Sequence, residues 1–288
     1  MAVASSEPAG RSHSARNWPR WASPLGLLNA LAAQAGVKEC PGLRYGPHTR
    51  HLLDAYLPLG ASGPAPVAVF FYGGGWETGE RSWYRFAASA LAARGVLTLV
   101  PDYRLFPEVR FPAFLDDAAA AVAWAGREAA ALGGDPARLF LMGHSAGAYI
   151  AAMLALQPGW LSGAPAGMIG LAGPYDFLPL GTDRLRAIFG PEADLPQTQP
   201  VNFVSSAAPP MMLATGGLDR TVLPRNTRRL TARLREAGVA VRERIYPALG
   251  HRLVAGALAR PLQPLLGWLG APVLDDMLDF ISDPRAPR

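Results

Sequence analysis

The chain has 288 residues, half of them hydrophobic, and a formal net charge of +5. This size allows one large α/β domain or two small ones, and one is the simpler interpretation. The charge does not indicate a nucleic-acid partner, because Lys38 is the only lysine and arginine-rich composition is more typical of a genome bias. A single cysteine, Cys40, excludes an intramolecular disulfide and a cysteine-based metal site, and no apolar run is long enough to span a membrane.

The N-terminal part carries two competing patterns. Basic residues precede the apolar stretch 24–33, and Ala33-Gln34-Ala35 resembles the cleavage site of a signal peptide. Against this, Asn29 interrupts the stretch, and Ser23-Pro24 is typical of a helix start. We therefore expect a disordered tail over residues 1–22, followed by a short docking helix, in a cytoplasmic protein. Export through a signal peptide is the alternative.

Apolar segments rich in β-branched residues alternate with helical patterns through the rest of the chain. This alternation predicts a mostly parallel sheet with helices on both faces. Two early segments, 42–45 and 52–57, are expected to pair as an antiparallel hairpin on its edge. The remaining expected strands lie at 67–72, 96–100, 139–142, 168–171, 211–215 and 239–246, and the expected helices near 82–94, 113–132, 146–157 and 224–237. The arginines of this last helix and of the strand after it are expected to be solvated.

Residues 174–210 form the most irregular segment of the chain. They are rich in proline, glycine and polar residues, with one short helix expected near 182–189. The segment is positioned to overhang the carboxyl ends of the strands, where sites in open α/β sheets occur. We therefore expect a single α/β domain over residues 23–288 with a lid-like insertion at 174–210.

A serine in a G-x-S-x-G pattern directly follows the expected strand 139–142. Gly143-His144-Ser145-Ala146-Gly147 leads into a run of small residues suited to a helix start. The glycines allow the strained turn between strand and helix that presents a nucleophilic serine. Ser145 is thus the candidate nucleophile, and we expect the ring of His144 to project away from it in a structural role. The pattern alone is weak evidence, because its residues are abundant in this chain.

A serine nucleophile needs a base to take its proton and a carboxylate to orient that base. His251, the sole histidine after Ser145, is the candidate base. Asp219, in a glycine-rich turn after the expected strand 211–215, is the candidate acid, with a turn-forming or helix-capping role as the alternative. Asp176 is a rival acid, because it also falls between the serine and the histidine in the chain.

The triglycine segment Gly73-Gly74-Gly75 follows another expected strand and offers backbone N–H groups without side chains. Acyl transfer needs such donors for the negative oxygen of the tetrahedral intermediate, each worth roughly 3 to 4 kcal/mol. We expect the N–H groups of Gly74, Gly75 and Ala146 to form this oxyanion hole. Trp76, Phe177 and Leu178 are candidate walls of an acyl or alcohol pocket, although ordinary core packing is an equally good interpretation of each.

These motifs together resemble those of α/β-hydrolase fold esterases, over about residues 42–282. The resemblance is greatest to the hormone-sensitive-lipase-like carboxylesterases and the related feruloyl-esterase and kynurenine-formamidase groups. It rests on Gly73-Gly74-Gly75-Trp76, Pro101-Asp102-Tyr103-Arg104-Leu105, the G-x-S-x-G pentapeptide, the Gly-Leu-Asp turn and Gly250-His251. It implies an α/β-hydrolase fold with a mostly parallel eight-stranded sheet, a serine hydrolase mechanism through an acyl-enzyme, and no cofactor.

The chain departs from these families at one position. Their oxyanion loop usually begins His-Gly-Gly-Gly, and here Tyr72 replaces that histidine. The backbone donors are retained, so the open question is how the loop is braced. Asp102 and Arg104 are expected to be a paired structural motif at the end of a strand.

The expected activity is hydrolysis of carboxylic esters with small acyl groups, with neither cofactor nor metal. The expected partner is a small-molecule ester, and a homodimer is left open. Arylformamidase-type amide hydrolysis would use the same groups. The alternative outside enzymes is a non-catalytic α/β-hydrolase-fold binding protein, although such proteins typically lack a triad member and none is missing here.

Overall fold

The structure, a computed structural model, describes residues 29, 32, 35–60 and 62–286. The N-terminal tail expected over residues 1–22 lies outside the described residues. Of the expected docking helix and signal-peptide pattern, the structure describes only Asn29, Ala32 and Ala35.

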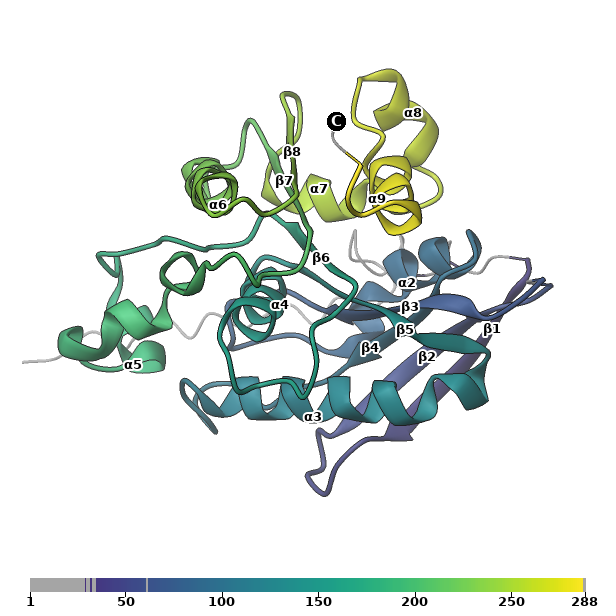
Figure 1. Ribbon diagram of the computed structural model, residues 1–288, viewed down its shortest axis with the longest axis horizontal. Helices are drawn as coiled ribbons and strands as arrows, with labels where there is room; N and C mark the ends of the chain where they lie inside the picture. Colours follow the sequence, from purple (N-terminus) through teal and green to yellow (C-terminus); the bar gives the residue numbers. More distant parts are fainter. Residues whose placement is uncertain (1–28, 30–31, 33–34, 61, 287–288) are drawn as a thin grey trace, which may run out of the picture.

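Eight strands form one sheet in the order β1-β2-β4-β3-β5-β6-β7-β8 (Figure 1). The edge hairpin β1-β2 is antiparallel, β2 is also antiparallel to β4, and the other neighbours are parallel. The predicted eight-stranded, mostly parallel sheet is therefore confirmed. Its strands are β1 (Val37–Arg44), β2 (Leu52–Pro58), β3 (Ala65–Phe71), β4 (Leu97–Pro101), β5 (Gly134–His144), β6 (Gly167–Leu171), β7 (Met211–Gly216) and β8 (Val241–Tyr246).

The central strands are buried on both faces, which explains why their sequences are continuous apolar runs rather than alternating ones. β5 begins five residues before the apolar run that predicted it. Ala65 and Pro66 of β3 pair with Gly134 and Asp135 across a register shift, so the ladder extends into a polar segment. The start of β5 is therefore determined by backbone pairing with β3 rather than by the burial of apolar side chains.

Helices cover both faces of the sheet (Figure 1). On one face, Phe280 of α9 packs edge-to-face on Phe140 of β5, and Arg94 beyond the end of α2 pairs with Asp275 of α9. On the other face, α3 packs against α4 through Phe114 and Tyr149. The helices are η2 (Arg81–Tyr84), α2 (Arg85–Ala92), α3 (Ala113–Glu128), η3 (Ala130–Leu132), α4 (Ala146–Leu156), α5 (Asp183–Phe189), η4 (Glu192–Thr198), η5 (Pro200–Phe203), α6 (Arg225–Glu236), α7 (His251–Gly256), α8 (Gln263–Trp268) and α9 (Val273–Ser282).

α6 separates its apolar and basic residues by face. Leu230 and Leu234 are fully buried, whereas the five arginines of the helix are exposed, as expected for a solvated face. Arg242 on β8 is an exception, because its side chain is buried and donates to the backbone oxygens of Asp283 and Ala286. In the described part of the chain, no helix has both the length and the apolar character needed to cross a bilayer.

Residues 174–210 carry α5, η4 and η5 and are fastened to the domain by a few specific contacts. The hydroxyl of Tyr149 on α4 donates to the backbone oxygen of Thr198, and the side chain of Gln199 accepts from the N–H of Phe177. The backbone N–H of Val201 donates to Tyr175. The bond from Tyr149 ties the segment to the helix that follows Ser145, whereas the other two hold the segment's own turns together.

Candidate active site

Ser145 lies in the turn between β5 and α4. Its φ of 55° and ψ of −121° are rarely adopted by a residue with a side chain, so the backbone is strained there. Two features hold the turn: the N–H of Ser145 donates to Leu171 of β6, and a Cβ at Gly147 would lie only 2.0 Å from the backbone oxygen of Phe71. Glycine at 147 thus lets α4 begin close against β3, with Ser145 at the carboxyl edge of the sheet.

Asp219 and His251 follow the neighbouring strands β7 and β8 at this same edge. Their loops are tied together by backbone hydrogen bonds, from Gly217 to Tyr246 and from Leu218 to Leu249, at 2.8 and 2.9 Å. The parallel pairing of β7 and β8 therefore sets the two side chains beside each other.

The structure brings Ser145, Asp219 and His251 into one hydrogen-bonded row. Nδ1 of His251 lies 2.7 Å from Oδ2 of Asp219, and Nε2 lies 2.9 Å from Oγ of Ser145. A carboxylate only accepts, so Nδ1 carries the proton and Nε2 is left to accept from the serine hydroxyl. This tautomer is the one that can take a proton from a serine nucleophile.

Asp219 is almost completely buried, and its second oxygen accepts from the backbone N–H groups of Thr221 and Val222, both at 2.9 Å. Burial opposes ionisation, but the hydrogen bonds from His251 and from these N–H groups hold the pKa of Asp219 below its usual range. One oxygen therefore stabilises the turn, while the other faces the imidazole as a candidate acid must.

Asp176 lies in a different environment. Its carboxylate forms an ion pair with Arg229 of α6 at 2.8 Å. Its backbone N–H donates to Asn226, which fixes the loop after β6 to the same helix. The rival acid thus has a guanidinium partner rather than an imidazole.

The triglycine loop runs alongside the serine. A Cβ at Gly73 would lie 3.1 Å from Cβ of Ser145 and 3.0 Å from the backbone oxygen of His144, so a side chain there would crowd the serine turn. Among the described residues, the N–H groups of Gly74, Gly75 and Ala146 donate to no protein acceptor. Three backbone donors, two on the loop that touches Ser145 and one on the residue after it, are therefore left without a protein acceptor among the described residues.

The loop is braced on its β3 side by Tyr72. The ring of Tyr72 stacks on Tyr103 with centroids 4.6 Å apart, and the Tyr103 hydroxyl donates to the backbone oxygen of Tyr72 at 2.8 Å. Arg50 donates to the Tyr72 hydroxyl at 2.8 Å. These contacts hold the residue that stands where the related families have histidine.

The prediction that Asp102 and Arg104 pair with each other is wrong, although both are structural. Asp102 accepts from the backbone and guanidinium of Arg81, at 2.7 and 2.5 Å. Arg104 instead binds Asp117 of α3 at 2.6 Å. The chain is irregular after β4 ends at Pro101, so the two side chains reach different helices.

The candidate pocket walls differ in burial. Trp76 is 4% exposed and packs among four rings, whereas Phe177 and Leu178 are half-buried. Phe177 stacks on Trp76 with centroids 6.2 Å apart and, of the four rings that contact Trp76, is the one that reaches the surface. The other rings around Trp76 are Phe114, Tyr149 and Phe189.

Two residues that touch this site have no catalytic signature in the sequence. His144 Nδ1 lies 2.7 Å from the hydroxyl of Tyr84, and His144 Nε2 lies 3.0 Å from the backbone oxygen of His251. His144 precedes Ser145 in the chain, and a structural role was predicted for it. Tyr84 lies 60 residues earlier in the chain, in η2, and no local pattern marks it.

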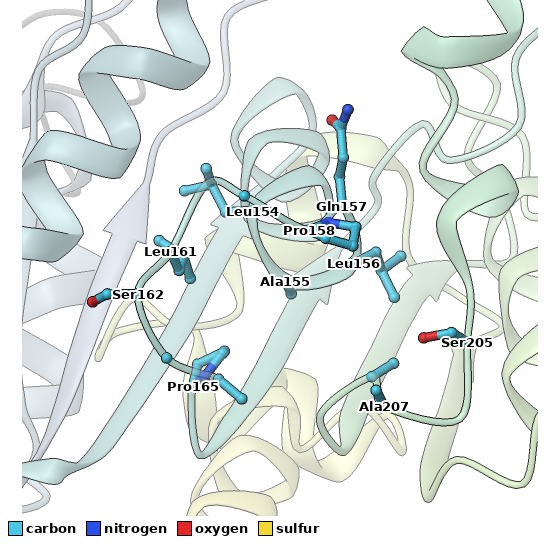
Figure 2. Close-up of a pocket in the computed structure, with 14 residues that line it drawn as sticks. Leu154, Ala155, Leu156, Gln157, Pro158, Leu161, Ser162, Pro165, Ser205 and Ala207 are labelled. Atoms are coloured by element: carbon cyan, nitrogen blue, oxygen red, sulfur yellow. The ribbon is translucent and has the colours of Figure 1, made fainter.

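Two depressions lie at the opposite edge of the sheet from Ser145. Both adjoin the loop 157–165 at the amino end of β6; one, of about 260 Å³, also reaches residues 205–208 before β7 (Figure 2). The other, of about 410 Å³, lies between this loop and α3. Their linings are mostly small and apolar. Within the described ranges, no group of three or more His, Cys, Asp or Glu side chains could hold a metal ion.

The family described as having the alpha/beta hydrolase fold matches residues 68–185. This range contains the triglycine loop and Ser145, but neither Asp219 nor His251. An esterase B of Lactobacillus rhamnosis, solved with a tributyrin phosphonate inhibitor, superposes with a TM-score of 0.77 at 19% identity. The alignment covers 92% of this chain and 93% of that one. The fold is therefore the α/β-hydrolase fold.

Curated relatives add a likeness in sequence. A probable isoprenylcysteine alpha-carbonyl methylesterase of Arabidopsis thaliana is 28% identical over 72% of this chain and 49% of its own length. A carboxylesterase of Mycobacterium tuberculosis is 40% identical over 38% of this chain and 35% of its own length. The chain thus spans about half, or less, of the length of these relatives.

Proposed function

We propose that this chain, an α/β-hydrolase-fold protein related in sequence to carboxylesterases, is a serine hydrolase that cleaves carboxylic esters with small acyl groups. The observation that carries the proposal is the hydrogen-bonded row from Asp219 through His251 to Ser145. It ends beside a loop with unengaged backbone donors.

In the first half of the reaction, His251 Nε2 takes the proton of Ser145 as Oγ forms a bond with the ester carbonyl carbon. The N–H groups of Gly74, Gly75 and Ala146 bind the resulting oxyanion. The ionised Asp219 stabilises the imidazolium. As the bond to the alcohol oxygen breaks, Nε2 returns the proton to that oxygen, which leaves an acyl group on Ser145.

In the second half, water attacks the acyl carbon and gives its proton to the same nitrogen. Collapse of the second intermediate returns a proton to Ser145 Oγ and releases the acid. Besides the ester and water, both halves use groups of this chain alone.

The names of the relatives support an ester rather than an amide as substrate. They include methylesterases and carboxylesterases. Trp76 and Phe177 would form an apolar wall for the substrate. The proposed substrate is therefore a small, uncharged ester, with methyl esters among the first to test.

A fluorophosphonate probe and an ester panel test the proposal together. The probe should label wild-type protein on Ser145, and Ser145→Ala should lose both labelling and hydrolysis of a short p-nitrophenyl ester while keeping the circular dichroism spectrum. The panel would compare methyl and p-nitrophenyl esters of increasing acyl length with a formanilide. No labelling of the wild type would favour a non-catalytic binding protein instead.

A further inference from the structure

We propose that Tyr84 and His144 are positioning residues, which hold the oxyanion loop and the backbone of His251 to the strand that carries Ser145. The inference rests on the proposed esterase function. It assigns a role to two side chains that do not themselves touch the reacting atoms.

Three hydrogen bonds connect parts of the site that are distant in the chain. The backbone N–H of Gly73 donates to the Tyr84 hydroxyl at 3.3 Å. That hydroxyl lies 2.7 Å from Nδ1 of His144, and Nε2 of His144 lies 3.0 Å from the backbone oxygen of His251. The oxyanion loop, the turn that bears the serine and the helix that begins at the base are thus joined through two side chains.

Only one arrangement of protons satisfies all three bonds with a neutral ring. The backbone oxygen of His251 can only accept, so Nε2 of His144 carries the ring proton. Nδ1 of His144 then accepts from the Tyr84 hydroxyl, whose oxygen is left to accept from Gly73. Every polar atom in this row therefore has one role.

The surroundings keep both side chains in these protonation states. Burial, with a smaller contribution from the charge of His251, lowers the pKa of His144 to about 3. Arg252 acts in the same direction, whereas Asp219 and the hydrogen bond to the His251 backbone oppose it. Burial raises the pKa of Tyr84 to about 12, so its hydroxyl remains a donor.

The two imidazoles lie with ring centroids 4.9 Å apart, yet they have separate tasks. His251 exchanges protons with Ser145 and the substrate, while a neutral His144 holds the backbone of His251. Gly73 immediately precedes the proposed donor Gly74, so the tyrosine hydroxyl fixes the start of the oxyanion loop. Displacements of about 1 Å at such groups can cost up to about a hundredfold in rate.

Tyr84→Phe removes the shared hydroxyl and keeps the ring. We expect kcat for the best ester of the panel to fall about tenfold with little change in KM, because the donors act mainly in the transition state. The inhibition constant of a trifluoromethyl ketone analogue should rise by the same factor. The thermal midpoint of Tyr84→Phe should fall no further than that of another variant that loses one buried tyrosine hydroxyl.

Tyr45→Phe is the matched control. Tyr45 and Tyr84 are 7% and 8% exposed, and the Tyr45 hydroxyl also makes a buried hydrogen bond, to the backbone oxygen of Asp102. The control should retain kcat within about twofold. If Tyr84→Phe behaves like this control, or loses only thermal stability, the positioning role is wrong.

Nitrogen-15 NMR of the wild type tests the same row without a variant. His144 should show the Nε2–H tautomer and remain neutral from roughly pH 5 to 9. A titrating ring or the other tautomer would overturn the inference, even if Tyr84→Phe did not fold. A wild type without ester hydrolysis would instead refute the proposed function, whereas an active wild type with an unimpaired Tyr84→Phe refutes only this inference.

Discussion

Oδ2 of Asp219 lies 2.7 Å from Nδ1 of His251 and accepts a hydrogen bond from its N–H, which fixes the imidazole in the tautomer that faces Ser145 with an unprotonated nitrogen. Asp176, which has the same order in the chain, is instead paired with Arg229 at 2.8 Å. The difference in partners separates two carboxylates that the sequence leaves as rivals.

Asp219→Asn should reduce kcat for a short p-nitrophenyl ester by about 10⁴-fold. An amide in this place donates a hydrogen bond to the imidazole and favours the wrong tautomer. Asp176→Asn is the matched substitution, and it should leave kcat within about twofold because it breaks only a partly exposed ion pair. Steady-state kinetics of both variants decide the assignment, and a larger loss at Asp176 would reverse it.

The strand predictions succeeded where burial decides the structure. β6 and β7 are buried along their whole length, and the apolar runs that predicted them match their bounds to within one residue. The start of β5 was missed because Gly134 and Asp135 join the ladder through backbone pairing with β3, and residues 136–138 lie in the register shift that follows. This segment has no run of apolar side chains from which a strand could be predicted.

The residues of the candidate site could be predicted where each one follows an apolar strand in the sequence. Ser145, Asp219 and His251 each follow a strand, and parallel strands bring such positions to one edge. Tyr84 could not be found this way, because its contacts with Gly73 and His144 depend on how η2 packs over the sheet. The partner of Arg104 was missed for the same reason, since Asp117 lies on a separate helix.

Gly147→Ala should destabilise the protein by about 3 kcal/mol, because the new Cβ would meet backbone atoms that cannot move without shifting β3. Gly126→Ala on α3 is the control. A Cβ there meets nothing within 4 Å on an exposed helix position, so we expect a gain of about 0.5–1 kcal/mol. Urea denaturation measures both, and an unchanged midpoint for Gly147→Ala would contradict the packing of α4 on β3.

Phe177→Ala should shift the acyl preference toward longer chains. Phe177 is the half-buried ring stacked on Trp76, and its removal opens space beside the proposed oxyanion loop. Phe111 is also half-buried and belongs to the same aromatic cluster through Phe114 and Phe189. The ratio of kcat/KM for octanoate and butyrate esters should rise about tenfold for Phe177→Ala and stay near wild type for Phe111→Ala. Equal ratios in the two variants would remove Phe177 from the pocket.

Asp117 should make the stability of the fold depend on pH in the acid range. Its carboxylate is 1% exposed, and it is bound by Arg104 at 2.6 Å and by His51 at 3.0 Å. Burial raises its pKa, but the hydrogen bonds from Arg104 and His51 outweigh this, so the pKa in the folded protein lies below the usual value. The unfolded chain therefore binds this proton more readily than the folded protein does.

The stabilisation from Asp117 is thus fully present above the unfolded pKa of about 3.9 and is lost as the pH falls through the lower folded pKa. Asp117→Asn should lower the free energy of unfolding by about 2 kcal/mol near neutral pH, and the deficit should shrink on acidification. Asp116→Asn is the control. Asp116 is largely exposed, and its remaining burial and the charge of Asp117 raise its pKa. This substitution should change the free energy of unfolding by no more than about 0.5 kcal/mol. Urea denaturation across the acid range measures these differences, and a deficit independent of pH would show that the carboxylate's charge does not stabilise the fold.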